Sequence, residues 1–283
     1  MARSSGALRL DHGDHVATQR ISYEELSPAV RAAIEDKTGP VIKARSVEVG
    51  LNSSVAARLD TEADEFFVKA LPTDHRWVWT QLREAEMAPF VRAVAPALVA
   101  RVVEDGWDVL VFEAVHGHHA DYAPGSPDLP IVARLLRTLG ELPAPGIELR
   151  RAEQRLRDYV SREEDLRYFA GDHLLHTDWN ASNVIVGRGA RIVDWGWATH
   201  GAAWLDAGYW VIWLIAAGHE PCDAESWARQ VPAWRTAPSE GIAAFAFANA
   251  RLWAEIGGAD PDAWTTRLVT AAARWRDYRT SAA

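Results

Sequence analysis

The sequence predicts an α+β fold in which an antiparallel sheet with one main helix precedes a mainly helical part. Short runs of β-branched and aromatic residues, separated by turn residues, occupy much of the segment between residues 41 and 112. After residue 128, apolar residues recur at helical spacing over long segments. The chain has 283 residues, of which 48% are hydrophobic, so it can bury one large core or the two modest cores of a two-lobed protein.

The first part of the chain contains the predicted sheet. Residues 1–20 are mixed and polar, and we expect a mobile tail there. Ser27 and Pro28 are typical of a helix start, with an N-cap followed by proline at the first helical position. Apolar alternation then predicts five strands, and a helix precedes the fourth. The strands cover residues 41–49, 55–59, 66–71, 96–103 and 107–112, and the helix covers residues 75–94.

The rest of the chain is predicted to be mainly helical. Residues 128–142 have a single apolar face, and residues 149–169 have the pattern of a charged amphipathic helix. Further helices are predicted at 205–218, 224–231, 239–256 and 261–278. These helices are rich in tryptophan, and we expect most of the rings to pack where helices meet.

Composition and charge exclude several classes of protein. The net charge of −9 argues against nucleic acid as a general partner and is compatible with a cationic substrate. The single cysteine, Cys222, excludes a disulfide framework and a cysteine-rich zinc site. The N-terminus has no apolar signal segment, and the most apolar stretch, residues 207–217, is too short to span a bilayer. We therefore expect a cytoplasmic protein without a membrane partner.

Three polar side chains between residues 176 and 196 suit phosphoryl transfer. This chemistry needs a carboxylate beside the attacking hydroxyl and oxygen ligands that hold Mg²⁺ against nucleotide phosphates. Asp178 is the candidate for the first role, and Asn183 and Asp194 are the candidate metal ligands. Residues 184–193 have the pattern of strand, glycine turn and strand, which would return Asp194 to the side of Asn183. A solvated polar turn is the alternative interpretation.

His176 stands just before this loop. A histidine in such a place more often braces the backbone through a hydrogen bond than takes part in chemistry. We therefore interpret His176 as a structural residue.

Lys69 is a lone lysine in an apolar strand. Burying an ammonium group is costly unless it is paired, and nucleotide α/β-phosphates together with a helix glutamate would fit that need. The predicted helix at 75–94 offers Glu84 and Glu86. A lysine that extends from an edge strand into solvent is the alternative.

The segment 50–54, Gly-Leu-Asn-Ser-Ser, predicts a hairpin tip with small side chains. Backbone N–H groups and the hydroxyls of Ser53 and Ser54 at such a tip can approach phosphate oxygens. Asn52 belongs to the same candidate nucleotide contact. An ordinary hairpin is the alternative.

Together these motifs resemble the aminoglycoside phosphotransferase and choline kinase-like family, which has a bilobal protein-kinase-like fold. The likeness is carried by His-x-Asp-x-x-x-x-Asn at 176–183, Asp-Trp-Gly at 194–196, and Lys69. It implies an N-terminal nucleotide-binding lobe at 1–113 and a helical catalytic and acceptor-binding lobe at 114–283. The loop residues 179–182 and the Trp-Gly-Trp that follows Asp194 depart from the commoner family sequences.

The resemblance also implies roles for particular residues. Glu84 is the expected helix partner of Lys69. The backbone carbonyl of Glu113 and the backbone amide of Val115 would contact adenine. Asp206 would cap the catalytic loop without taking part in the chemistry.

The resulting hypothesis is a Mg²⁺-dependent enzyme that transfers the γ-phosphate of ATP or GTP to a hydroxyl of a small molecule. An aminoglycoside or related antibiotic is the first candidate acceptor, and a metabolite such as an amino alcohol or sugar, or a peptide hydroxyl, is the second. A nucleotide-binding scaffold without activity is the alternative from another class, although a scaffold has no need of Asp178. The acceptor, the choice between ATP and GTP, and the oligomeric state do not follow from the sequence.

Overall fold

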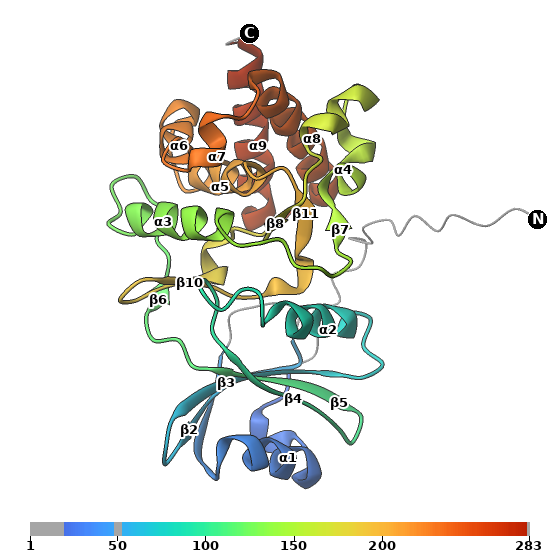
Figure 1. Cartoon of the computed structure of the whole chain (residues 1–283), viewed down its shortest axis with the longest axis vertical. Helices are drawn as coiled ribbons and strands as arrows, with labels where there is room; N and C mark the ends of the chain where they lie inside the picture. Colours follow the sequence, from blue (N-terminus) through green and yellow to red (C-terminus); the bar gives the residue numbers. More distant parts are fainter. Residues whose placement is uncertain (1–19, 48–52, 282–283) are drawn as a thin grey trace, which may run out of the picture.

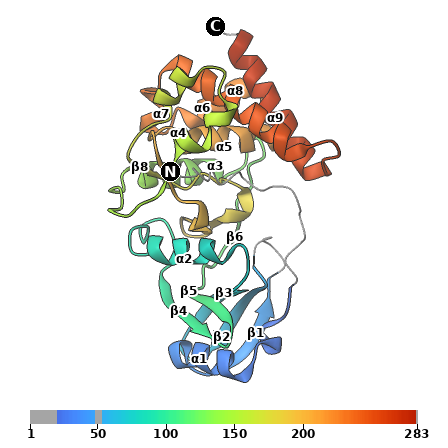
Figure 2. The ribbon, with the colours of Figure 1, turned by 90° about the vertical axis from the view of Figure 1, so that its right-hand side faces the viewer.

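The computed structural model describes residues 20–47 and 53–281, which form a sheet lobe and a helical lobe (Figure 1). Asn52 and most of the predicted N-terminal tail lie outside the described residues. Figure 2, turned by 90°, shows the two lobes stacked along the long axis of the molecule, with helix α2 at their boundary. The predicted α+β, bilobal fold class is therefore confirmed.

The sheet lobe contains a five-stranded antiparallel sheet with the strand order β1-β2-β3-β5-β4. All five predicted strands are present. They are β1 (Val41–Ser46), β2 (Val55–Thr61), β3 (Glu65–Pro72), β4 (Leu98–Glu104) and β5 (Trp107–Glu113). Side chains alternate between the two faces of a strand, so Val68 and Ala70 enter the core on one face and Lys69 points to the other.

Two helices lie on opposite faces of this sheet (Figure 1). Helix α1 (Pro28–Thr38) begins where expected, and the hydroxyl of its N-cap Ser27 accepts a hydrogen bond from the Val30 amide at 3.4 Å. Its apolar residues Val30 and Ile34 complete the core on the Val68 side. Helix α2 (Val78–Met87) covers the face on which Lys69 lies.

Helix α2 is shorter than the predicted helix at 75–94. It ends at Met87, two residues before Pro89. Proline has no backbone N–H to bond to the preceding turn, and its ring obstructs the helical carbonyl four residues back. The remaining residues up to Pro96 continue as turns, and Val91 and Val94 are buried there without a helix.

The helical lobe is built around the apolar helix α5. Its helices are α3 (Leu129–Gly140), α4 (Ala152–Arg155), α5 (Leu205–Ala216), α6 (Pro221–Ala228), α7 (Pro232–Arg235), α8 (Ser239–Gly257) and α9 (Ala263–Ser281). Trp210 from α5, Phe245 from α8 and Trp275 from α9 are completely buried in one core. The expectation that most tryptophans of these helices pack in the interior is confirmed, although Trp264 remains 39% exposed.

The prediction of one helix at 149–169 is wrong. This segment forms strand β7 (Arg150–Arg151), the short α4, and the 3-10 turns η2 (Arg157–Tyr159) and η3 (Glu163–Tyr168). The backbone is extended at Val160, whose carbonyl accepts a hydrogen bond from Arg251 on α8 at 3.2 Å. Tyr159 and Phe169 are still buried, so the apolar pattern is satisfied by packing on α8 rather than by one continuous helix.

The loop at residues 176–183 connects two small three-stranded sheets. One has the order β10-β9-β6 and the other the order β7-β11-β8. The strands are β6 (His118–His119), β8 (His173–Leu175), β9 (Val184–Val186), β10 (Ala190–Ile192) and β11 (Thr199–Gly201). The predicted hairpin at 184–193 is therefore present as β9 and β10. Within the described ranges, no helix is both long and apolar enough to cross a membrane.

Candidate active site

A cavity of about 230 Å³ lies at the boundary between the two lobes. Its walls come from the sheet, from α2, from the segment after β5, and from the loop that ends at Asp194. The predicted site residues that line it are Ser53, Lys69, Glu84, Glu113, Val115, Asn183 and Asp194. Residues from five separate places in the sequence thus meet around one hollow.

Lys69 lies between two carboxylates in this cavity. Its ammonium group forms an ion pair with Glu84 of α2, and lies 3.2 Å from the Oδ1 atom of Asp194. The side chains of Lys69 and Glu84 are 12% and 5% exposed, so this contact is largely shielded from water. Glu86, the other glutamate considered, instead pairs with Arg83 at 3.0 Å on the helix surface.

The charges in this group influence one another. Burial by itself lowers the pKa of Lys69, but the carboxylates of Asp194 and Glu84 outweigh it and raise that pKa above its ordinary value. The ammonium of Lys69 in turn lowers the pKa of Asp194. Burial raises the pKa of Glu84 despite the opposing effect of Lys69. Asp194 is thereby kept ionised at neutral pH, as a ligand for a hard cation must be.

The backbone of Asp194 has an unusual conformation. Its φ and ψ angles of 68° and 63° lie in the left-handed region, which is uncommon for residues other than glycine. This turn follows the β9–β10 hairpin and leads directly into the 3-10 turn η5 (Trp195–Trp197). The amide of Val193 donates to the carbonyl of Asn183 at 2.9 Å, so the hairpin returns the chain to Asn183 just before Asp194.

Asp178 and Asn183 are joined through their side chains. The Nδ2 atom of Asn183 donates to the Oδ2 atom of Asp178 at 2.8 Å and lies 3.3 Å from the Asp178 carbonyl. The amide of Asn180 donates to the other carboxylate oxygen of Asp178 at 3.2 Å. Since the nitrogen of the Asn183 side chain is held by Asp178, its oxygen is the end that suits a metal.

Burial raises the pKa of Asp178 above its ordinary value, and the charge of Asp194 adds to the effect. Asp178 is not part of the cavity lining, whereas its partner Asn183 is. The carboxylate of Asp178 is therefore connected to the cavity lining through its hydrogen bond with Asn183.

His176 is a brace, as predicted. Its Nε2 atom lies 2.9 Å from the Val193 carbonyl, and its Nδ1 atom accepts a hydrogen bond from the Asp178 amide at 3.3 Å. These partners assign the proton of a neutral ring to Nε2. The completely buried ring also lies edge-on to Trp195, with 4.8 Å between the ring centroids.

The carboxylate of Asp206 caps the same loop by binding its backbone amides. One carboxylate oxygen accepts a hydrogen bond from the His176 amide and the other from the Thr177 amide, both at 2.9 Å. Thr177 has a φ angle of 71°, a left-handed conformation that these contacts support. The loop that presents Asp178 is therefore held by a buried side chain that comes from helix α5.

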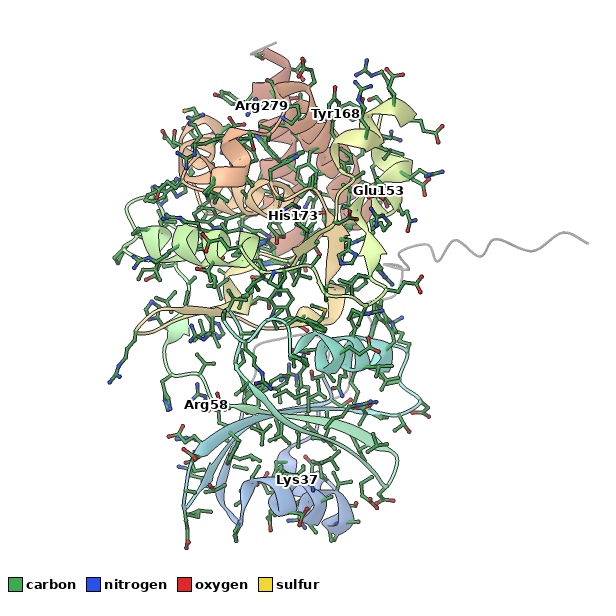
Figure 3. All side chains as sticks on the ribbon, viewed as in Figure 1. Lys37, Arg58, Glu153, Tyr168, His173 and Arg279 are labelled. Atoms are coloured by element: carbon green, nitrogen blue, oxygen red, sulfur yellow. The ribbon has the colours of Figure 1, made fainter. Side chains whose placement is uncertain are left out.

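The segment after β5 forms the far wall of the cavity. Glu113 and Val115 both line it, which is compatible with backbone contacts to a purine. Sequence reasoning missed Arg58, which also lines the cavity and whose guanidinium donates to the Val115 carbonyl. Figure 3 shows Arg58 on the sheet lobe beside this segment. Its position as an arginine within an otherwise buried strand is the signal that could have indicated it.

The two candidate serines have different surroundings. Ser53 lines the cavity. Ser54 is buried, and its backbone amide donates to the Ala70 carbonyl at 3.0 Å, within the sheet. Of the two, Ser53 is the one that is open to the cavity.

The oxygen atoms of Asn183 and Asp194 suit Mg²⁺, which typically takes one or two protein ligands and completes its shell with phosphates and water. Among the residues that the structure describes, no group of three or more histidine, cysteine and acidic side chains could hold a metal by itself. The donor set thus fits a metal that arrives with a nucleotide rather than one held by the protein alone.

Comparison with known proteins was informative at the level of structure. No family model and no curated protein matches the sequence. Choline kinase LicA from Streptococcus pneumoniae matches the structure with a TM-score of 0.58 and 13% identity, over 88% of this chain and 98% of LicA.

Two antibiotic phosphotransferases match in the same way. A thermostable mutant of aminoglycoside phosphotransferase APH(4)-Ia, in complex with AMP-PNP and hygromycin B, has a TM-score of 0.58 and 13% identity, over 87% of this chain and 98% of that chain. Spectinomycin phosphotransferase APH(9)-Ia, in complex with ADP and spectinomycin, has a TM-score of 0.55 and 11% identity, over 88% of this chain and 93% of that chain. The chain therefore has the protein-kinase-like fold that choline kinase LicA and these aminoglycoside and spectinomycin phosphotransferases share.

Proposed function

We propose that this protein is an enzyme that transfers the γ-phosphate of ATP or GTP, together with Mg²⁺, to a hydroxyl of a small molecule. The observation that carries the proposal is the meeting of Lys69, Glu84, Asn183 and Asp194 at one cavity, with Asp178 hydrogen-bonded to Asn183. Positioning and charge neutralisation supply most of the catalysis in phosphoryl transfer, and these side chains are suited to both tasks.

Asp178 is the proposed catalytic residue. Its carboxylate would accept the proton of the acceptor hydroxyl while the hydroxyl oxygen attacks the γ-phosphorus. The bond from that phosphorus to the β–γ bridging oxygen would break, and the nucleoside diphosphate would leave with the bond's electron pair. Hydrogen bonds from Asn180 and Asn183 orient the carboxylate. A pKa raised by burial brings the group closer to the working pH, which favours a general base.

The remaining residues would hold the nucleotide. Lys69, oriented by Glu84, would bind the α- and β-phosphates. The Glu113 carbonyl and the Val115 amide would contact the purine. Ser53, with Asn52 beside it, would approach the phosphates.

Asn183 and Asp194 would bind Mg²⁺, which neutralises charge that builds up on the phosphate oxygens. Asp194 can bind Mg²⁺ only if its negative charge is not fully neutralised by the ion pair with Lys69. The ion pair between Lys69 and Glu84 limits that neutralisation, because it holds the ammonium on the helix side.

The proposed acceptor is a hydroxyl-bearing small molecule. An aminoglycoside or related antibiotic is the first candidate, supported by the likeness to enzymes crystallised with hygromycin B and spectinomycin. An amino alcohol or another metabolite is the second, supported by the equally close likeness to a choline kinase.

The decisive experiment is a screen of hydroxyl-bearing antibiotics and metabolites for a Mg-ATP-dependent gain of one phosphate, detected by mass spectrometry. Asp178→Asn serves as the blank, because it keeps the size of the side chain and removes the base. We expect transfer by the wild type and a loss of at least about a hundredfold in the variant. Transfer that persists in Asp178→Asn would contradict the assignment of Asp178 as the base. A wild type that does not bind Mg-nucleotide would contradict the proposed function.

A further inference from the structure

A guanidinium group is clamped between two tryptophan rings where the lobes meet. The Cζ atom of Arg150 in β7 lies 4.6 Å from the centroid of Trp79 and 4.7 Å from that of Trp197. Trp79 belongs to α2 in the sheet lobe, and Trp197 is the last residue of η5, three residues after Asp194. The two rings also meet edge-on, with 5.2 Å between their centroids.

The clamp is continuous with the catalytic loop. The guanidinium of Arg155 lies 5.6 Å from the Trp197 ring and donates to the hydroxyls of Thr177 at 2.8 Å and Thr199 at 2.7 Å. Thr177 immediately precedes Asp178. The Trp197 ring, which contacts Trp79 of α2, is therefore also linked through Arg155 to the loop that presents the proposed base.

Helix α2 is pressed closely against the segment that follows Asp194. A Cβ atom added to Gly196 would lie 2.7 Å from the Cβ atom of Thr80, so only glycine allows this approach. Glu84, which forms the ion pair with Lys69, belongs to this helix. The position of α2 on η5 thus determines whether Glu84 reaches Lys69.

The rings are the main attraction that holds Arg150. Within residues 20–47 and 53–281, no ion pair joins its guanidinium to a carboxylate, and the cations nearby are Arg83 and Arg155. Burial and these two like charges lower the pKa of Arg150. A planar guanidinium stacks on aromatic faces, and such contacts strengthen when water is excluded. The two tryptophan rings therefore provide the attraction that a carboxylate partner would otherwise provide to Arg150.

We infer that Arg150 is a positioning residue for the proposed phosphoryl transfer. Its guanidinium ties Trp79 of α2 to Trp197 of η5, and this contact keeps Glu84 against Lys69. When Glu84 is displaced, Lys69 retains Asp194 as its partner and competes with the metal for that carboxylate. The inference rests on the proposed function, since it concerns the same nucleotide site.

The test measures the binding of AMP-PNP with Mg²⁺ by calorimetry, which requires no knowledge of the acceptor. Arg150→Ala is expected to weaken binding about tenfold, the change that corresponds to roughly one desolvated cation–π contact. Arg150→Lys should show an intermediate effect, because the lysine keeps the positive charge near the rings but lacks the planar guanidinium, which also stacks on an aromatic face.

Arg167→Ala is the matched control. The guanidinium of Arg167 lies 4.8 Å from the Tyr168 ring, in a surface contact of the same kind in the helical lobe. Its loss should leave nucleotide affinity unchanged. Thermal unfolding of all variants monitors the fold.

A double-mutant cycle separates positioning from a merely structural role. Glu84→Gln removes the group on which Arg150 is inferred to act, so Arg150→Ala should cause less than about a twofold further loss in that background. Equal losses in both backgrounds would overturn the inference, as would unchanged affinity of a folded Arg150→Ala protein. A wild type that does not bind Mg-AMP-PNP would instead contradict the proposed function.

Discussion

Replacing Asp206 by alanine should destabilise the protein strongly, because two amides of the catalytic loop depend on this carboxylate. The amides of His176 and Thr177 each donate to one of its oxygens at 2.9 Å. Asp206 is only 4% exposed, so water cannot take its place without rearrangement of the loop. Asp206→Ala would leave two buried N–H groups without acceptors.

The magnitude follows from these bonds. A hydrogen bond to a charged group contributes about 1.5–3 kcal/mol, so the loss of two should lower the free energy of unfolding by about 4 kcal/mol. Asp206→Asn keeps one acceptor oxygen and turns an NH₂ group toward the other amide. Its expected cost is about 2 kcal/mol.

The assay is urea denaturation of the wild type and the Asp206 variants, with the free energy extrapolated to water. It is best run under mildly alkaline conditions, because burial raises the pKa of Asp206 and the ionised form accepts both bonds. Asp260→Ala, at an exposed position, is the control and should stay within about 0.5 kcal/mol of wild type. A loss below about 1 kcal/mol in Asp206→Ala would refute the capping role.

Three further predictions concern the cavity and its surroundings. Lys69→Met leaves two carboxylates without their shared counter-ion, and should lower the free energy of unfolding by about 3 kcal/mol in urea at neutral pH; an unchanged midpoint would contradict the ion-pair assignment. Gly196→Ala should cost about 1–3 kcal/mol in the same assay because the new methyl group meets Thr80, whereas Gly140→Ala, with open space around it, should be neutral or slightly stabilising. Once an acceptor is known, kcat/KM should fall with decreasing pH as Asp178 becomes protonated. Since burial raises the pKa of Asp178, this acid limb should lie above the ordinary aspartate value of about 3.9, and a flat profile down to about pH 4 would argue against Asp178 as the base.

The local parts of the site were predictable from the sequence because each depends on a short pattern. The polar positions from Asp178 to Asn183, the hairpin that follows, and the capped start of α1 arise from residues close together in the chain. Strand alternation also placed Lys69 on the face opposite to Val68, because successive side chains in a strand point to opposite sides.

Apolar periodicity gave a wrong prediction where contacts with distant residues determine the backbone conformation. The pattern at 149–169 is amphipathic, yet the chain is extended at Val160 because Arg251 binds its carbonyl and helix α8 covers its apolar residues. No pattern within the segment carries that information, since the contact joins residues about ninety positions apart.

By itself, the sequence indicated most of the residues that line the cavity and the order of most helices and strands. The family resemblance indicated Glu84 as the partner of Lys69, and the structure contains that ion pair, but only the tertiary structure decided that Arg58 reaches the Val115 carbonyl. It also decided that Arg150 lies between rings from two lobes. These contacts depend on how α2 and the sheet pack against the helical lobe. That packing is determined by side-chain contacts and charges on segments that are far apart in the chain.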